Sequence, residues 1–402
     1  MDRSFKNKWG ESPWQWRVAR AAGRVPARAD FVVIGGGFSG LSAAAWLGRM
    51  APGRKVVLVE AEEIGAGASG RTGGMALAET AGGDLPGLGD VLGGFAEILK
   101  ELKIDCDFLA RGAWELGRRD TSEDAGKDAS NNSGKITHND AGDRSSDKAG
   151  KKERGQPEIS WTDSGTLRVV HEVPGGTVDA GKLLSGLARA ASRANVTMVQ
   201  GRAASALKFG ENIRVVLKGG KIAAGGVLIA TNAQSLELAG LQERATPKLT
   251  MGVCTGPLSA RAIREIGLSS RRPFYTVDLP YLWGRLRKNN CAIFGAGLVS
   301  VRNWEELHAL DVRRGLAVEL LASLKERVRG LHAELRGVQF THAWGGPILL
   351  TEEARPIFRR VRARQNAIYL GGYNGHGVAL SVYLGRWAAE ALLGVRELPR
   401  WN

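Results

Sequence analysis

The sequence predicts an α/β or α+β fold, and three observations lead to that prediction. Apolar runs typical of strands alternate with amphipathic runs typical of helices along most of the 402 residues. No segment repeats at intervals of about 20–50 residues, so a solenoid or a propeller is not expected. A strand, a turn, a helix and a second strand follow one another within about 30 residues from Ala29 onward, which favours a parallel sheet.

The first 28 residues form an arm rich in basic and aromatic side chains. They contain no continuous apolar core, so we do not interpret them as a secretory signal. No run of about 18 apolar residues occurs in the chain, and no transmembrane helix is expected. Cys106, Cys254 and Cys291 lie far apart without a CxxC pair. We interpret them as buried thiols in a reducing compartment, and therefore expect a cytoplasmic protein without a metal site.

The next segment predicts a nucleotide-binding turn. The strand Phe31–Ile34 and the helix Leu41–Leu47 are separated by a GxGxxG pattern formed by Gly35, Gly37 and Gly40. In such a turn one glycine allows the tight bend, one admits a pyrophosphate and one lets the helix pack on the strand. The helix N-terminus then offers free N–H groups to the phosphates.

The second strand, in "RKVVLVEAE", ends at Glu60, twenty residues after the last glycine of the pattern. A carboxylate at this place accepts hydrogen bonds from a ribose diol. Together these residues predict a Rossmann-type dinucleotide site, but they do not distinguish NAD from FAD.

From Arg119 to Pro157 the composition changes. This stretch has one large apolar residue, Ile136, and no aromatic residue. It cannot bury enough apolar surface to offset the loss of chain entropy, so we expect residues 119–157 to be a disordered insert. A regulatory or docking role remains the alternative, and we assign His138 to no site.

The rest of the chain predicts further alternating elements. Residues 159–200 contain a strand, a turn, an amphipathic helix and another strand. A hairpin across Gly219-Gly220 leads to an apolar strand ending at Ala230-Thr231, and two strands flank a turn at Asn289-Asn290. Residues 303–331 predict one long helical stretch, and 378–394 a C-terminal helix.

The formal net charge of +15 has two interpretations. Lys and Arg are scattered, without a basic run of five or six residues, which favours a solvated arginine-rich surface that attracts anionic substrates. A nucleic-acid or membrane-surface partner is the alternative, and we consider a nucleic-acid partner unlikely.

A resemblance separates the two cofactors. "IGAGASGRTGG" at 64–74 resembles the stretch after the second strand in the D-amino-acid-oxidase-like family of FAD-dependent oxidoreductases. It is most similar to the gamma-glutamylputrescine oxidase branch, where Asn is usual at the position that Thr72 holds here. "SPWQW", "PGGTVDAGKLLSGLARAA", "LIATNA" and "THAWGGPILLTEEARPIF" resemble further segments of that family. The resemblance covers nearly the whole chain except 119–157.

The resemblance implies a Rossmann-type FAD-binding domain interleaved with a mixed-sheet substrate domain, that is, an α/β fold with an α+β second domain. After the arm 1–28, the FAD-binding domain would comprise 29–85, 175–240 and 338–402. The substrate domain would comprise 86–118, 158–174 and 241–337. FAD would lie extended through the first domain, and the sheet of the second would cover the flavin ring.

The resemblance also implies the cofactor residues. The glycine-rich "GGYNGHG" at 371–377 would return to the flavin, so that backbone groups at Asn374 to Val378 and the following helix N-terminus face its N1–C2=O edge and stabilise negative charge there. The expected set is Gly35, Gly37, Phe38, Ser39, Gly40, Glu60, Ala61, Ser69, Gly70, Arg71, Thr72, Gly73, Gly74, Met75, Ala203, Ala204, Ala230, Thr231, Asn232, Gly372, Tyr373, Asn374, Gly375, His376, Gly377 and Val378. No Cys or His occupies "GASGRTGG", so we expect FAD to be bound non-covalently.

The reaction implied is removal of hydride from a carbon that bears an amine, onto flavin N5, giving an imine that hydrolyses. Oxygen or another acceptor would then reoxidise the flavin. Alternation in "PYLWGRLRK" places Tyr281, Trp283 and Arg285 on one strand face, which we assign to the substrate, with Arg285 pairing with a substrate carboxylate. A partly exposed strand is the alternative. His376 would orient substrate or flavin, or only bond within its turn.

Two competing functions remain open from the sequence. Some members of the family act on modified tRNA, and a basic chain suits that activity. A non-catalytic flavoprotein that assists assembly of a partner would also bind FAD. The amine, the electron acceptor and the oligomeric state are not determined by the sequence.

Overall fold

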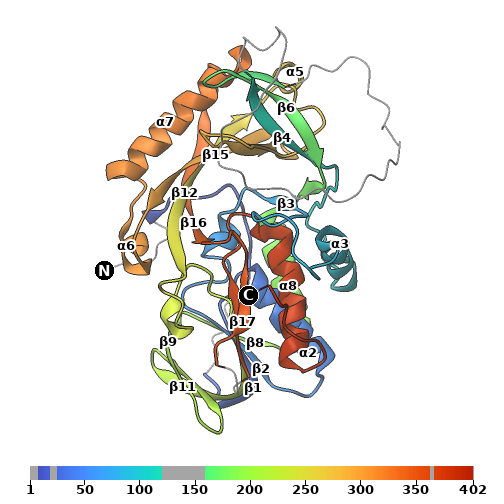
Figure 1. Ribbon diagram of the computed structural model, residues 1–402, viewed down its shortest axis with the longest axis vertical. Coiled ribbons are helices and arrows are strands. Elements are labelled where there is room, and N and C mark those ends of the chain that lie inside the picture. Colours follow the sequence, from blue (N-terminus) through green and yellow to red (C-terminus); the bar gives the residue numbers. More distant parts are fainter. Residues whose placement is uncertain (1–7, 19–24, 120–158, 363–365, 402) are drawn as a thin grey trace.

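Two large sheets form the body of the molecule and lie one above the other along its long axis (Figure 1). The computed structural model describes residues 8–18, 25–119, 159–362 and 366–401. A short pair of strands, β3 (Met75–Leu77) and β7 (Gly175–Thr177), lies between the two sheets.

The lower sheet has a parallel centre. Its order is β17-β18-β11-β1-β2-β8, and β18, β11, β1, β2 and β8 all run parallel. β10 extends it through antiparallel pairing with β11, and β9 pairs antiparallel with β10. The bounds of these strands are β1 (Arg28–Ile34), β2 (Val56–Glu60), β8 (Thr197–Gln200), β9 (Ala204–Lys208), β10 (Ile213–Leu217), β11 (Gly220–Ile229), β17 (Ile357–Arg360) and β18 (Ala367–Gly371).

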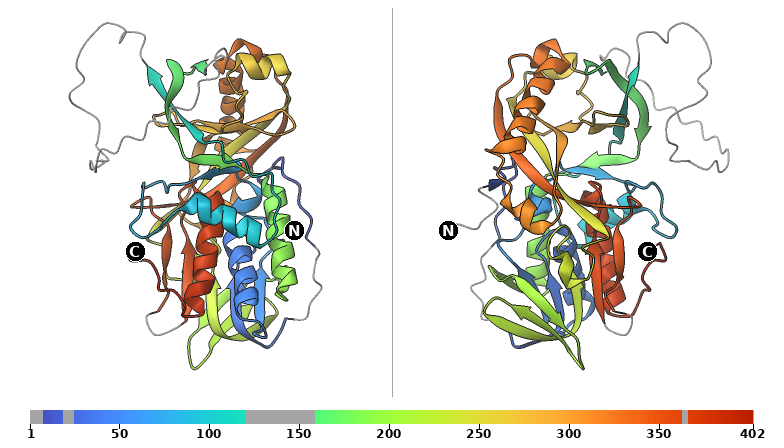
Figure 2. Two further views of the ribbon diagram at one scale, coloured as in Figure 1. Left: turned by 90° about the vertical axis from the view of Figure 1, so that its right-hand side faces the viewer. Right: turned by 60° about the vertical axis from the view of Figure 1, so that its left-hand side comes forward.

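Helices α8 (Gly377–Leu392), α2 (Phe38–Met50) and α4 (Ala180–Arg193) lie side by side against this sheet, as Figure 2 shows in red, blue and green. Small residues bring α2 and α8 together, since a Cβ at Gly385 would lie 2.7 Å from the Ser39 carbonyl oxygen. Ser42 adds a hydrogen bond from its hydroxyl to the Val382 carbonyl, 2.7 Å long. This contact fixes the N-terminal ends of both helices at one edge of the sheet.

The upper sheet is mixed. Its order is β16-β12-β15-β14-β13-β4-β6-β5, with every pair antiparallel except β13 with β4. The bounds are β4 (Ala113–Arg119), β5 (Ser160–Thr162), β6 (Thr166–Val173), β12 (Ala245–Pro257), β13 (Phe274–Thr276), β14 (Trp283–Leu286), β15 (Cys291–Ser300) and β16 (Phe340–Thr351).

The helices of the upper part are α5 (Ala260–Glu265), α6 (Trp304–Ala309) and α7 (Gly315–Leu331), and α7 packs along β12, β15 and β16. Short 3₁₀ turns lie at η1 (Ala68–Gly70), η2 (Leu236–Leu238) and η3 (Ala333–Leu335). The mixed sheet, the parallel sheet and the alternation of elements confirm the predicted fold class.

One predicted element is wrong. The helical stretch at 303–331 is broken into α6 and α7 by Leu310–Arg314. Leu310 has extended backbone angles, and the Val312 N–H donates to the Lys8 carbonyl over 2.8 Å instead of continuing a helix. The partner that interrupts the helix belongs to the N-terminal arm, so its effect could not be read from residues 303–331 alone.

Two elements pair or pack across the predicted division of the chain, which the pairing of strands does not test. β16 falls within 338–402 but pairs with β12 in the upper sheet. α3 (Val91–Glu101) falls within 86–118 but packs on α8, next to it in Figure 1. The division into an FAD-binding and a substrate domain otherwise stays a prediction.

The predicted insert 119–157 lies outside the described residues except for Arg119, the last residue of β4. The three cysteines are buried and unpaired, as expected from their spacing. Among the helices that the structure describes, none has the length and apolar character needed to cross a membrane.

Candidate active site

A cavity of about 1090 Å³ extends from the carboxyl ends of β1, β2 and β11 to the upper sheet. Its lower wall contains Gly35, Gly37, Glu60 and Ala61. Its upper wall contains aromatic and aliphatic side chains from β13, β14, β15 and α7, among them Tyr275 and Trp283. The carboxyl edge of a parallel sheet is the usual ligand-binding place in open α/β folds.

The glycine turn after β1 is shaped by close backbone contacts. Gly35 has φ +110°, and a Cβ there would lie 2.5 Å from the Ala230 carbonyl oxygen. A Cβ at Gly40 would lie only 1.9 Å from the Gly35 carbonyl oxygen, so a side chain cannot fit there. α2 begins at Phe38 on the cavity wall. The first N–H groups of a helix have no partner within it, so the start of α2 presents partial positive charge to an anion, although the Phe38 N–H itself donates to Ser69.

Glu60 closes the lower wall. Its carboxylate accepts the Gly36 N–H at 2.7 Å and the Glu62 N–H at 3.0 Å. Burial raises the pKa of this carboxyl, while these backbone donors act in the opposite direction. Glu60 therefore holds the glycine turn, and its predicted bond to a ribose stays a prediction. Ala203 and Ala204, at the start of β9, lie on the same cavity wall.

The loop 64–74 is held by tryptophans. Trp14 and Trp16, in the arm, donate their indole N–H groups to the carbonyls of Thr72 and Ile64 over 2.6 and 2.7 Å. Trp344 of β16 donates to the Arg71 carbonyl over 2.9 Å. The loop is thus fixed from two directions while it faces the cavity.

Arg71 belongs to this loop and is buried. Its guanidinium donates to the Gly10 carbonyl over 2.9 Å and to the Gly345 carbonyl over 3.2 Å. Burial lowers its pKa to about 10. Ser69 accepts the Phe38 N–H at 2.9 Å, which joins the loop to the start of α2.

The C-terminal glycine-rich turn reaches the same cavity. Asn374 has φ +52° and its side-chain oxygen accepts the Thr351 N–H at 2.8 Å, which fixes the turn to β16. The Tyr373 hydroxyl lies 2.6 Å from the Ser39 hydroxyl, which joins this turn to α2. A Cβ at Gly375 would meet nothing within 4 Å, so the backbone there is open to an approaching group.

His376 occupies the N-cap position of α8 and lines the cavity. Its Nδ1 lies 3.3 Å from the Asn374 carbonyl oxygen, and burial lowers its pKa, so the ring is neutral near pH 7. Its ring meets the Tyr275 ring edge-on, with centroids 6.4 Å apart.

Of the 26 residues expected at the cofactor, four do not line the cavity and act through the backbone instead. Gly40 and Gly70 pack against the carbonyls of Gly35 and Gly65. Gly372 donates its N–H to the Asn232 side chain over 2.9 Å. The fourth is Gly74, whose carbonyl accepts from Arg285. The other residues of that set line the cavity together: Gly35, Gly37, Phe38, Ser39, Glu60, Ala61, Ser69, Arg71, Thr72, Gly73, Met75, Ala203, Ala204, Ala230, Thr231, Asn232, Tyr373, Asn374, Gly375, His376, Gly377 and Val378.

The upper wall contains two of the three strand residues that we assigned to the substrate. Tyr281 and Trp283 line the cavity, whereas Leu282 and Leu286 are buried in the hydrophobic core of the upper sheet. Arg285 does not line the cavity, and its expected contact with a substrate carboxylate stays a prediction. Its guanidinium is buried and donates to the carbonyls of Gly74 and Val178 over 2.7 and 2.6 Å.

Sequence reasoning missed Tyr275. Tyr275 of β13 lies opposite Trp283 of β14 in their antiparallel pairing. The alternation that indicated Trp283 would also indicate Tyr275 once this register is known. Its hydroxyl lies 2.9 Å from a carboxylate oxygen of Glu79 and 2.9 Å from one of Glu115. Desolvation and these two carboxylates raise its pKa, so it remains a protonated hydroxyl.

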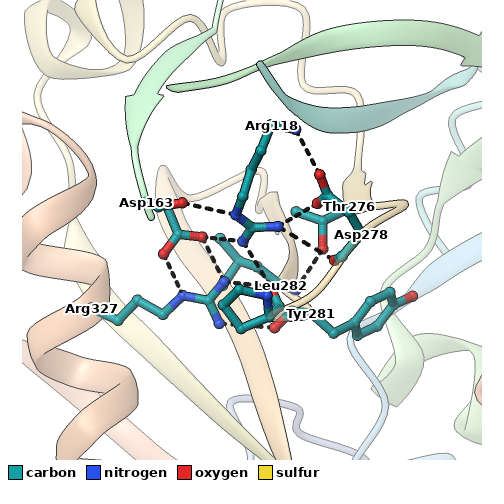
Figure 3. Close-up of polar contacts among 8 residues, drawn as sticks. Arg118, Asp163, Thr276, Asp278, Tyr281, Leu282 and Arg327 are labelled. Atoms are coloured by element: carbon teal, nitrogen blue, oxygen red, sulfur yellow. Dashed lines mark hydrogen bonds and ion pairs between the residues drawn. The ribbon is translucent and has the colours of Figure 1, made fainter. Parts of the chain in front are cut away.

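Sequence reasoning also missed an ionic cluster above the cavity. Figure 3 shows the guanidiniums of Arg118 (β4) and Arg327 (α7) both turned toward Asp163, in the turn between β5 and β6. Arg327 lines the cavity. The three residues are far apart in the sequence, and no local pattern indicates that they meet.

The comparisons with known proteins agree with this geometry. The family model described as FAD dependent oxidoreductase matches residues 30–391. A probable oxidoreductase OrdL from Rhizobium meliloti is 28% identical over 392 residues, 91% of this chain and 83% of that protein. The gamma-glutamylputrescine oxidoreductase of Escherichia coli is 27% identical over 389 residues, 92% of this chain and 84% of that protein.

Solved structures show the same fold. L-amino acid deaminase from Proteus myxofaciens has a TM-score of 0.69 at 15% identity, covering 98% of this chain and 96% of its own. Glycine oxidase from Geobacillus kaustophilus has a TM-score of 0.67 at 18% identity, covering 92% of this chain and 96% of its own.

The residues present fit FAD. Side-chain-free positions at Gly35, Gly37 and Gly375 leave room for close approach, and two helix N-termini open on the cavity that joins them. The cavity is long enough to connect the dinucleotide turn with an aromatic wall, as an extended nucleotide with a flavin ring requires. The chain therefore belongs to the family of FAD-dependent oxidoreductases, the D-amino-acid-oxidase-like flavoenzymes.

Proposed function

We propose that this enzyme oxidises the carbon next to the nitrogen of a primary or secondary amine or of an amino acid. FAD, when bound, accepts the hydride of that carbon at its N5 atom. The substrate loses one hydride from carbon and one proton from nitrogen, and the resulting imine reacts with water to give a carbonyl compound and the free amine. Oxygen or another acceptor then receives the two electrons.

The observation that carries this proposal is the joining of two kinds of wall in one cavity. The glycine turn after β1 and the N-terminus of α8 lie on the same cavity as Trp283 and Tyr275. The start of α8 contributes partial positive charge, which stabilises an anion placed against it. The aromatic rings of Trp283 and Tyr275 restrict how a small substrate lies in the cavity.

Proton removal from the substrate needs no dedicated base, because an amine releases hydride once it is neutral. Burial lowers the pKa of His376 at the wall, and the same desolvation disfavours a bound ammonium ion. Tyr275 remains a hydroxyl, and its ring and that of His376 define one corner of the wall. His376 therefore serves in our proposal to orient the bound molecules.

The test is anaerobic reduction of the purified protein. Amines and amino acids are added one at a time, and bleaching of the visible flavin spectrum is recorded. Dithionite is the control that shows the flavin can be reduced. Bleaching by an amine or amino acid supports the proposal. A flavin that dithionite reduces but no amine or amino acid bleaches contradicts it, and favours the non-catalytic alternative.

The same preparation tests the tRNA alternative that the charge of +15 leaves open. Binding of tRNA that weakens steeply with added salt would favour it.

We propose a cytoplasmic location on the strength of the three buried, unpaired cysteines.

A further inference from the structure

We propose that the substrate is an amine with an aryl or long alkyl group and without a carboxylate on the carbon next to the nitrogen. This inference rests on the proposed function and narrows its substrate class. Two features of the upper wall carry it. One is an exposed apolar rim, and the other is a guanidinium that already forms an ion pair within the protein.

The rim of the cavity is apolar and unusually exposed. Leu279 is 83% exposed, Leu298 46% and Tyr281 42%, and all three line the cavity. Leu320 and Leu324 of α7 continue the lining. Large apolar side chains gathered at a cavity mouth indicate a ligand that covers them. An aryl or alkyl group on the substrate would do so, because the rim is continuous with the wall that holds Trp283.

Arg327 is the guanidinium on this part of the wall, and it forms a bidentate ion pair with Asp163. Its Nε donates to one carboxylate oxygen of Asp163 over 2.8 Å and its Nη2 to the other over 2.6 Å. Its Nη1 and Nη2 also donate to the carbonyls of Tyr281 and Pro280 over 2.9 and 2.7 Å. The bidentate pair is visible in Figure 3. Arg327 therefore fixes the backbone at Pro280 and Tyr281, next to Leu279. Its bidentate pairing is already made with Asp163, so we do not expect it to form one with a substrate carboxylate.

The surrounding charges balance without a ligand. Arg118 donates to Asp163 over 2.5 Å, also pairs with Asp278, and donates to the Pro280 carbonyl over 2.7 Å. Two guanidiniums thus face two carboxylates. The Asp163 side chain is only 6% exposed, so water screens the cluster poorly.

The other guanidiniums on the described cavity wall lie elsewhere. Arg71, within the loop 64–74, donates to the carbonyls of Gly10 and Gly345, and Arg202 precedes Ala203 at the nucleotide end. Arg285 is outside the lining. A carboxylate next to the reacting carbon would therefore lose water without gaining an ionic partner, which is costly.

Binding can be measured apart from turnover with two ligands that have no hydrogen on the amine-bearing carbon. One is α,α-dimethylphenethylamine, and the other is α-methylphenylalanine, which has a carboxylate in place of one of the two methyl groups. Calorimetry on the FAD-loaded enzyme gives both dissociation constants. We expect the amine to bind at least about tenfold more tightly. Equal binding, tighter binding of the amino acid, or binding of neither ligand would overturn the inference.

Variants of the rim and of the cluster add a second test. Leu279→Ser should weaken binding of the amine about three- to tenfold, because a large apolar contact is lost. Leu316→Ser is the matched control, since Leu316 is 54% exposed on α7 but does not line the cavity, and it should bind as the parent enzyme does. An equal loss in both variants, or no loss in either, contradicts a role for the rim.

Asp163→Asn keeps the shape of the side chain and removes the negative charge that pairs with Arg327. The preference for the amine over the amino acid should then fall about tenfold. Leu279→Lys, at an exposed position, should shift the preference in the same direction, and it serves if Asp163→Asn does not fold. An unchanged preference in every folded variant contradicts the inference.

The outcome is distinguishable from failure of the proposed function. If the dimethyl amine binds preferentially but no amine or amino acid bleaches the flavin, the oxidation proposal fails and the assigned ligand class stands. If phenylalanine bleaches the flavin faster than phenethylamine, oxidation stands and the substrate class is wrong.

Discussion

Replacing Arg285 with methionine tests how the upper wall is built. From the sequence alone we expected Arg285 to pair with a substrate carboxylate, whereas in the structure its guanidinium donates to two backbone carbonyls. The Gly74 carbonyl keeps the Val178 N–H at 2.9 Å when the guanidinium is removed. Among the hydrogen bonds of the described residues, Arg285 is the one donor to the Val178 carbonyl, and leaving this buried carbonyl without a partner costs about 1–3 kcal/mol.

Two further effects act on the same substitution. The guanidinium lies 5.9 Å from the centroid of the Trp14 ring, and losing this contact costs about 0.5–1 kcal/mol. Methionine is apolar and avoids the cost of burying a charge, which offsets part of that loss. We expect Arg285→Met to lower the free energy of unfolding by about 1–3 kcal/mol and to weaken FAD binding, because Gly74 belongs to the loop that faces the cavity.

The assay combines urea unfolding, the dissociation constant for FAD, and kcat/KM for one amine and the matching amino acid. Arg287→Met is the control, because Arg287 lies over the same Trp14 ring at 4.7 Å but donates to neither of these two carbonyls in the described contacts. A structural role predicts that the ratio of the two kcat/KM values stays the same in Arg285→Met. Selective loss of the amino acid, with stability and FAD binding unchanged, would refute this reasoning.

Three further predictions follow from the cavity and the core. Gly40→Ala should abolish FAD incorporation, because its Cβ would lie 1.9 Å from the Gly35 carbonyl oxygen, whereas Gly330→Ala, with nothing within 4 Å, should retain it; the flavin absorbance of both purified variants decides. Burial raises the pKa of Tyr369, so the folded protein keeps a proton that the unfolded chain releases above about pH 10. Stability should therefore fall as pH rises through that value, and less steeply in Tyr369→Phe; equal urea midpoints at pH 8 and 10.5 in the parent protein would contradict this linkage. Acid precipitation should release FAD into the supernatant, since no Cys or His occupies "GASGRTGG", and yellow colour that stays with the pellet would show a covalent bond.

The nucleotide end of the site could be predicted because its determinants are local. Gly35, Gly40 and Glu60 lie within a single strand-turn-helix-strand unit, and their backbone requirements follow from that unit. The resemblance of 64–74 and 371–377 to known flavoproteins extended the prediction to residues that now line one cavity. Alternation also singled out the strand face of Trp283, whose side chain lines the cavity, because the side-chain period of a strand is two whatever surrounds it.

Alternation could not say what each side chain on that face meets. Arg285 points to the side it was expected to, but the carbonyls of Gly74 and Val178 reach it first, and they lie 211 and 107 residues away in the sequence. The break between α6 and α7 has a similar cause, because its hydrogen-bond partner is Lys8.

The sequence by itself determined the family, the cofactor and the glycines that admit it, because these depend on short stretches whose backbone geometry is encoded locally. Only the tertiary structure decided which charges remain for a ligand. Arg118, Asp163 and Arg327 come from β4, the β5–β6 turn and α7, and they satisfy one another only when the upper sheet is assembled. A charged side chain pairs with the opposite charge that lies closest to it in space, and the order of residues along the chain does not contain that distance.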